Sequence, residues 1–278
     1  MAGPSFIGRR ESFASIGSTN DVVRAWLDEG APEVCLAVAD EQTAGRGRSG
    51  RTWTAPPGAG LLLSVGFRPT WLPADRTWQL AANVALSMAE AGEAVAGLPE
   101  RSIRLKWPND LVVETLQGDV LKLAGVLGET TGLDGPDPRV IVGIGVNADW
   151  PAADFPPELA GGMTSLRVVA GDGSRIDRSD VLDAFLDRLE ARTVTLRDGR
   201  FDAAAWVARQ LTNGRPVRLD GGDGRSEVVQ ALGVDVATGG LIVADPSAAA
   251  GQRTVLSGEI VHLRLADEPV EPQLTVGV

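Results

Sequence analysis

Apolar residues recur along the chain with two different spacings, and these spacings predict its helices and strands. Continuous apolar runs at 34–39, 61–67 and 140–146 predict short strands, and the run at 61–67 is expected to be buried on both faces. Helical spacing in 76–95 predicts a long amphipathic helix whose apolar positions are Trp78, Leu80, Ala81, Val84, Ala85 and Met88.

Further helices are expected where polar caps precede helical runs. The polar residues 18–20 stand before a run at 21–27 that ends at Gly30 and Pro32. Two more helices are expected near 180–194 and 201–211. Strands are expected at 103–106 and from Leu111, and 121–129 is expected to pair with the latter as a hairpin across a turn at Gly118.

The pattern changes near residue 212. From there, short β-like runs alternate with glycine and aspartate, at 216–219, 227–236, 241–243, 253–256 and 259–265. Short strands separated by turn residues favour a small β-barrel or sandwich. The sequence therefore predicts an α+β domain over 1–212, in which helices pack on a mixed sheet, a small β domain over 213–266, and a tail over 267–278.

Composition narrows the function classes. The chain has 278 residues and a formal net charge of −11, which disfavours nucleic acid as a partner. The first fourteen residues lack the apolar core of a signal peptide, and no stretch approaches eighteen consecutive apolar residues. Cys35 is the only cysteine, so no disulfide can form within the chain. We therefore expect a cytoplasmic protein that does not enter the membrane.

Few residues of the chain suit nucleophilic or zinc chemistry. His262 is the only histidine and lies in the small β domain, which disfavours a histidine-dependent triad in the first domain. Cys35 lies in an apolar strand and is expected to be a buried small hydrophobe. Without a cluster of histidines and cysteines, no zinc site is expected.

The most distinctive segment is 45–51, which reads GRGRSGR. It matches the dinucleotide fingerprint G-x-G-x-x-G, but no strand directly precedes it and the two prolines and two glycines of 53–60 cannot open a helix. It is not a Walker A loop either, because no Gly-Lys-Ser/Thr follows. Three arginines between glycines indicate an anion-binding loop that becomes ordered around its ligand. A merely solvated basic loop remains the alternative.

Several motifs in register resemble the biotin–protein ligases. They are STN at 18–20, GRGRSGRTW at 45–53, KWPND at 106–110, KLAG at 122–125, GIGVN at 143–147 and TSL at 164–166. The resemblance covers most of 13–170 and implies the catalytic fold shared by biotin ligases and class II aminoacyl-tRNA synthetases, followed by an SH3-like β-barrel. It implies the activity of a biotin–[acetyl-CoA-carboxylase] ligase, which forms biotinyl-5′-AMP from biotin and ATP and then modifies a carrier lysine.

The resemblance also implies residue roles at the biotin end of the site. Ser18, Thr19 and Asn20 would contact the ureido head of biotin. The pocket wall would consist of Gln42, Arg46, Gly47, Arg48, Lys122 and Gly125.

At the nucleotide end, the implied adenylate-binding residues are Arg46, Arg51, Trp53, Asn109, Lys122 and Asn147, with Trp53 and Asn147 near adenine. The implied catalytic residues are Arg48, Arg51, Asp110 and Lys122. Lys122 would bridge the biotin carboxylate and the α-phosphate, and Asp110 would hold or deprotonate the incoming lysine. Mg²⁺ would accompany ATP without a dedicated protein cage.

Each motif also has a purely structural interpretation. The polar residues 18–20 serve as a helix cap in most proteins, and the Asn-Asp pair after Pro108 is common in turns. Lys122 flanks an apolar run, where a lysine usually points outward. Trp53 and Trp107 could be core aromatics, and this is the expectation for Trp107.

The expected partner is the biotin carboxyl carrier domain of an acyl-CoA carboxylase, and the expected state is a monomer or a weak homodimer. Many bacterial relatives carry an N-terminal winged helix that binds DNA. Residues before Ser18 leave no room for one, so we expect a ligase without a repressor role. The segment 114–120 is longer than is usual in the family. The alternatives are a lipoate or octanoate protein ligase of the same fold, and a non-enzymatic biotin sensor.

Overall fold

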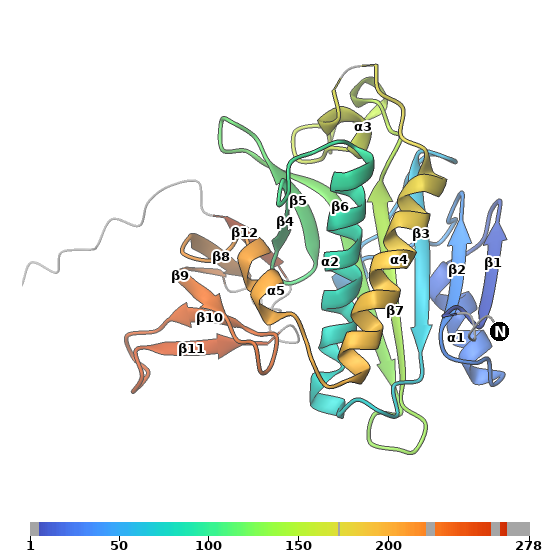
Figure 1. Cartoon of the computed structure of the whole chain (residues 1–278). Coiled ribbons are helices and arrows are strands. Elements are labelled where there is room, and N and C mark those ends of the chain that lie inside the picture. The colour runs from blue at the N-terminus through green and yellow to red at the C-terminus, as the bar shows by residue number, and fades with distance from the viewer. Residues whose placement is uncertain (1–5, 172, 221–225, 257–261, 266–278) are drawn as a thin grey trace, which may run out of the picture.

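The computed structural model describes the chain except for residues 1–5, 172, 221–225, 257–261 and 266–278. Its larger part is a seven-stranded sheet with helices on both faces, and its smaller part is a five-stranded antiparallel sheet (Figure 1). The elements up to the last long helix are β1 Arg9–Phe13, α1 Thr19–Asp28, β2 Cys35–Ala39, β3 Gly60–Phe67, α2 Trp78–Val95, β4 Ile103–Lys106, β5 Asp110–Glu114, β6 Val120–Thr131, β7 Arg139–Asn147, α3 Leu166–Val169 and α4 Arg178–Arg197.

The remaining elements form the C-terminal part. They are α5 Ala203–Arg209, β8 Pro216–Asp220, β9 Ser226–Val234, β10 Leu241–Ala244, β11 Gln252–Val255 and β12 His262–Leu265. The strands pair in the order β11-β10-β9-β8-β12. This agrees with the expected small β domain, whose predicted tail at 267–278 lies outside the described residues. The predicted boundary near 212 falls between α5 and β8 and stays a prediction.

The large sheet has the order β1-β2-β3-β7-β6-β5-β4, and every pair except β1 with β2 is antiparallel. The predicted strands and long helices are present with shifts of a few residues at their ends. The expected hairpin joins β5 to β6, and Gly118 in its turn has a φ of +90°. The parallel strand β1 was not predicted, because its sequence RRESF lacks an alternating apolar pattern and is held only by pairing with β2.

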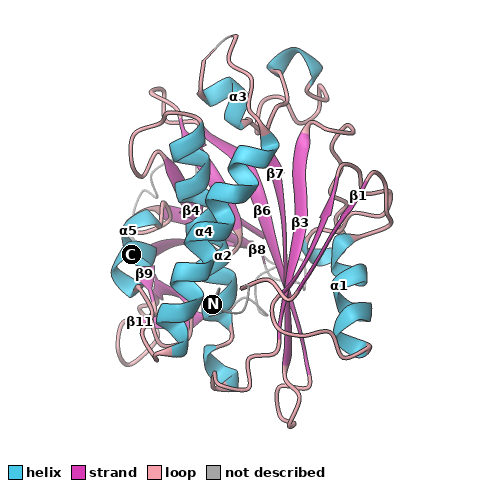
Figure 2. Ribbon diagram, turned by 45° about the vertical axis from the view of Figure 1, so that its right-hand side comes forward, coloured by secondary structure: helices cyan, strands magenta, loops and turns pink. Residues whose placement is uncertain are grey.

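The two faces of the large sheet carry different side chains. Helices α2 and α4 cover one face, and α1 lies against the other (Figure 2). On β3, Leu61, Leu63 and Val65 join the main core under α2 and α4. The residues between them face α1, and a Cβ at Gly66 would lie 2.5 Å from Cγ1 of Val23. The prediction that 61–67 is buried on both faces is confirmed, and the small residues Ser64 and Gly66 leave room for α1.

Two tryptophans join the small sheet to the large one. Trp107 Nε1 donates to the carbonyl oxygen of Gly239 at 2.9 Å, and Trp78 Nε1 donates to that of Ala237 at 3.3 Å. Gly239 has a φ of +75°, and a Cβ there would lie 2.8 Å from Cδ2 of Trp78. Glycine is therefore required in this turn. Trp107 is 3% exposed, which confirms that it is a core aromatic.

Candidate active site

A cavity of about 140 Å³ lies on the α1 face of the large sheet. Its wall contains every residue proposed from the sequence for the site except Asn147. Strands and loops far apart in the chain therefore meet at one place. The described lining residues include the cations Arg46, Arg48, Arg51, Lys106 and Lys122, against the single carboxylate of Asp110. This excess of positive charge in an acidic protein favours an anionic ligand.

The first turn of α1 presents polar groups that are almost fully buried. Thr19 donates to Oε1 of Gln42 from its backbone nitrogen at 2.7 Å and from its hydroxyl at 3.0 Å. Ser64 Oγ on β3 lies 2.7 Å from Thr19 Oγ1 and 2.6 Å from Asn20 Oδ1. Ser18 stands at the N-cap position without a side-chain cap bond. The polar triplet is thus organised by strand β3 and Gln42, beyond what helix capping requires.

Asn20 presents a donor that the described residues leave without a partner. Its Nδ2 atom is buried and makes no hydrogen bond among them. An unsatisfied buried donor is costly, so its presence beside a cavity indicates a ligand acceptor. The amide fits because Gly143 on β7 leaves space for it: a Cβ at Gly143 would lie 2.2 Å from Asn20 Oδ1.

The indole of Trp53 packs against two paired glycines of the large sheet. Gly125 on β6 pairs with Gly145 on β7. A Cβ added at Gly125 would lie 3.2 Å from the indole of Trp53, and a Cβ added at Gly145 would lie 2.5 Å from it. Lys122 Nζ lies 5.5 Å from the centroid of that ring. Trp53 Nε1 is also buried without a partner among the described residues. The glycines therefore let one wall of the site approach the sheet backbone closely.

Lys122 and Asp110 form an ion pair across the β5–β6 hairpin, with Nζ 2.7 Å from Oδ1. Both side chains line the cavity and are partly exposed to solvent. Lys122 therefore points into the site, although it follows an apolar pattern in which lysine usually points outward. The sequence had suggested both residues, but not that they contact each other.

Asn109 and Asn147 are held by backbone atoms. Asn109 Nδ2 donates to the carbonyl oxygen of Val126 at 3.0 Å, which ties the turn after Pro108 to β6. Asn147 is 4% exposed, and its Nδ2 donates to the carbonyl oxygen of Thr164 at 2.9 Å. Asn147 does not line the cavity, so its suggested contact with adenine stays a prediction that this geometry does not support.

The glycine–arginine segment 45–53 folds as a compact hairpin, called the arginine loop below. Arg46 pairs with Thr52, Gly47 N donates to the carbonyl oxygen of Arg51 at 2.7 Å, and Trp53 N donates to that of Gly45 at 3.0 Å. A Cβ at Gly45 would lie 2.4 Å from the carbonyl oxygen of Trp53. The chain continues into β3 without an intervening helix, which agrees with the rejection of a dinucleotide fingerprint.

Two of the loop arginines lie in different electrostatic surroundings. Burial lowers the pKa of the Arg48 guanidinium, the carboxylate of Asp110 opposes this, and nearby Arg51 adds to it. Arg46 instead forms ion pairs with Asp21 and Glu129. The Arg46 guanidinium is the main cause that lowers the pKa of Asp21 to about 2.

Several residues of the site were given no role from the sequence, although all of them except Ser64 lie within the motifs that carry the family resemblance. Ser64 lies within a run of apolar residues, and Gly143 and Gly145 alternate with branched apolar residues, so none of them indicates a ligand by its local pattern. Thr52 and Lys106 also line the cavity. A glycine in a buried strand is a known sign of close approach, and this signal could have identified Gly143 and Gly145.

The described residues contain no group of three or more His, Cys, Asp or Glu side chains placed to hold a metal ion. In the same part of the chain, no helix has the length and apolar character needed to cross a membrane.

Comparisons with known proteins agree on one family. Residues 12–147 match the Biotin/lipoate A/B protein ligase family. The chain is 33% identical over 255 residues to a biotin–[acetyl-CoA-carboxylase] ligase of Mycobacterium tuberculosis, covering 90% of this chain and 88% of that protein. It is 36% identical over 177 residues to the bifunctional ligase/repressor BirA of Bacillus spizizenii, of which it spans only 51%.

A solved structure leads to the same result. The biotin protein ligase of Aquifex aeolicus, solved in complex with biotin and ATP, superposes with a TM-score of 0.74 and 28% identity, over 93% of this chain and 99% of that one. The sequence match covers most of both proteins, and the structural match extends over both sheets. The chain belongs to the biotin protein ligases.

Proposed function

We propose that this cavity binds biotin and ATP, joins them as biotinyl-5′-AMP, and passes the biotinyl group to a lysine of a biotin carboxyl carrier domain. The observation that carries the proposal is the composition of the cavity wall. It combines buried neutral donors and acceptors at the first turn of α1 with five cations around a single carboxylate. Biotin has a neutral polar ureido head and an anionic tail, and ATP is a polyanion.

The ureido head would lie against the first turn of α1. Asn20 Nδ2 would donate to the ureido oxygen, and the oxygens of Ser18 and Thr19 would accept from the ureido nitrogens. Ser64 and Gln42 orient these groups through the hydrogen bonds that they make with Thr19 and Asn20. The family resemblance placed Trp53 near adenine; packed on two glycines, its indole would instead form an apolar wall for the ring system of biotin.

In the first reaction, an oxygen of the biotin carboxylate attacks the α-phosphorus of ATP, and pyrophosphate leaves. The two reactants repel each other because both are anions. Lys122, Arg48 and Arg51 would reduce this repulsion and stabilise the charge that develops on the phosphate oxygens. Magnesium would enter with the nucleotide and neutralise its phosphates, because the described residues of the cavity wall offer one carboxylate, that of Asp110.

In the second reaction, the neutral ε-amine of the acceptor lysine attacks the acyl carbon, and AMP leaves with the bonding electron pair. The amine is mostly protonated near neutral pH and must lose a proton. Asp110 is the carboxylate available to take or hold that proton. It also lines a second cavity of about 510 Å³, between α2, β6 and the small sheet, from which a lysine could approach.

The test is mass spectrometry of an apo carrier domain incubated with this protein, biotin and MgATP. We expect one biotinyl group to be added, and biotin-dependent release of pyrophosphate. The same incubation with lipoate in place of biotin should leave the carrier unmodified. Modification by lipoate alone would indicate a lipoate ligase, and tight biotin binding without pyrophosphate release would indicate a sensor.

A further inference from the structure

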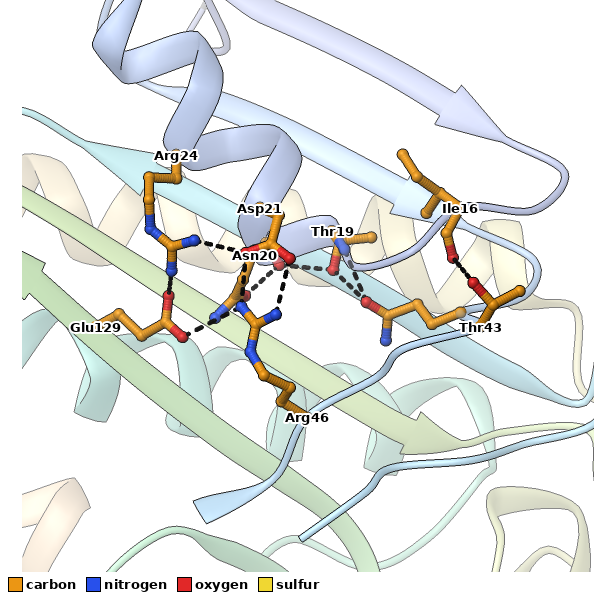
Figure 3. A network of polar contacts seen from close by, with 10 residues as sticks. Ile16, Thr19, Asn20, Asp21, Arg24, Thr43, Arg46 and Glu129 are labelled. Carbon is orange, nitrogen blue, oxygen red and sulfur yellow. Dashed lines mark hydrogen bonds and ion pairs between the residues drawn. The ribbon is translucent and has the colours of Figure 1, made fainter. Parts of the chain in front are cut away.

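Four charged side chains form a closed ring at the edge of the cavity, and Arg46 is the member of the ring that also lines the cavity wall. Arg46 of the arginine loop donates to both carboxylate oxygens of Asp21 at 2.7 Å, and its Nη2 lies 3.5 Å from Oε1 of Glu129. Arg24 also donates to Asp21, at 2.5 Å, and to Glu129. Figure 3 shows the two guanidinium groups between the two carboxylates. Positive and negative groups alternate around this ring, so their charges balance.

The ring connects three elements that are distant in sequence. Asp21 and Arg24 lie in α1, Arg46 lies in the arginine loop, and Glu129 lies in β6. Asp21 follows Thr19 and Asn20 in the first turn of α1, so the turn that would read the ureido head also holds the loop. Gln42, just before the loop, is anchored to Thr19 as well. The first turn of α1 therefore binds both the arginine loop, through Asp21, and the residue Gln42 that precedes the loop.

The guanidinium of Arg46 already has two anionic partners. A bidentate contact with one carboxylate and a second carboxylate nearby occupy its planar donors. Turning Arg46 toward a phosphate would break the ring and leave Asp21 and Arg24 to rearrange. Arg48 lines the same cavity, but its charged neighbours are Asp110 and Arg51 and not the carboxylates of the ring.

We infer that Arg46 is a positioning residue: with Asp21 and Glu129 it forms a latch that holds the arginine loop closed over the site, and it is not a phosphate ligand. This inference rests on the proposed function and differs from the role in adenylate binding that the family resemblance implies for Arg46. The latch keeps Arg48, Arg51 and Trp53 in place while the adenylate waits for its acceptor. Opening the latch would release the adenylate early.

The first test is Asp21→Asn, which keeps the size of the side chain and removes its charge. Exposed ion pairs are individually weak, so we expect the KM for biotin and the rate of adenylate release each to rise about fivefold, while kcat for adenylation is unchanged. Trypsin should cut the ligand-free variant faster after Arg48 and Arg51, as identified by mass spectrometry. The matched control is Asp28→Asn, which removes an ion pair of the same helix with Arg139 and should change none of these values.

The second test compares Arg46→Gln with the double variant that also carries Asp21→Asn. A latch predicts that the double variant is no worse than Arg46→Gln, because both changes break the same contact. The inference is overturned if Asp21→Asn matches the wild type in KM and in trypsin cleavage, or if Arg46→Gln lowers kcat for adenylation by about a hundredfold, as loss of a transition-state contact would. If the wild type forms no adenylate, the proposed function fails, and the trypsin comparison still decides whether the latch exists.

Discussion

The two faces of the large sheet are built from alternating residues of the same strands, yet one face packs the main core and the other lines the candidate site. Leu61, Leu63 and Val65 of β3 pack under α2 and α4, whereas Ser64 between them contacts the polar turn of α1. On β7, Ile144 joins the core, and its neighbour Gly145 supports Trp53. One face buries large apolar side chains for stability, and the part of the other face that lines the site carries small or polar residues, which leave room for a ligand. Changes one residue apart should therefore separate stability from activity.

The largest expected effect is that of Lys122→Ala on the site face. Loss of a group that stabilises developing charge should lower the rate of biotin-dependent pyrophosphate release by about 10²–10³. The melting temperature should hardly change, because the lysine is partly exposed and its ion pair with Asp110 is near solvent. Near-normal adenylation would remove Lys122 from the proposed mechanism.

Gly145→Val should have the next largest effect. The valine side chain would occupy the space that the indole of Trp53 fills and would displace the arginine loop, so kcat/KM for biotin should fall by about a hundredfold. The matched variant on the opposite face is Val146→Ala, at a core residue that does not line the cavity, and it should cost about 2 kcal/mol of unfolding free energy and leave kcat/KM unchanged. If both variants lose activity equally, the two faces are not separable on β7.

The pair Leu63 and Ser64 sharpens the comparison on β3. Leu63→Ala removes a side chain that is 1% exposed and should cost about 2–5 kcal/mol of unfolding free energy, measured by denaturant titration. Ser64→Ala removes a hydroxyl that orients Thr19 and Asn20, and should raise the KM for biotin about threefold to tenfold while costing only about 1 kcal/mol of unfolding free energy. An unchanged KM in Ser64→Ala would mean that Thr19 and Asn20 keep their orientation without the hydrogen bonds from Ser64.

The smallest expected effect concerns pH and the latch. Arg46 chiefly lowers the pKa of Asp21, from 3.8 to about 2. Because the folded pKa is depressed, the stability that this carboxylate contributes is complete above the unfolded value and is lost as the pH falls through about 2. The stability difference between wild type and Asp21→Asn should therefore be constant from pH 6 to pH 9, about the range of ordinary assays, and shrink only in acid. A difference that changed between those two values would indicate another titrating group.

Much of the architecture could be predicted because its signals are local. Apolar runs identified β3 and β7, helical spacing identified α2, and the turn residue Gly118 identified the β5–β6 hairpin. Strand β1 was not predicted because its polar sequence shows no alternation of apolar and polar residues, and only its parallel pairing with β2 makes it a strand. The motifs likewise predicted that Lys122 and the arginine loop belong to the active site, since lysine and arginine between glycines are unusual in an acidic chain.

By itself, the sequence determined which residue types were available for the site, and the short motifs that carry the family resemblance. Only the tertiary structure decided which residues meet: Ser64 with Asn20, Trp53 with Gly145, and Arg46 with Asp21. The physical reason is strand register, because a shift of one residue would move every side chain to the opposite face of the sheet. Register depends on pairing between distant segments, and no local pattern contains it.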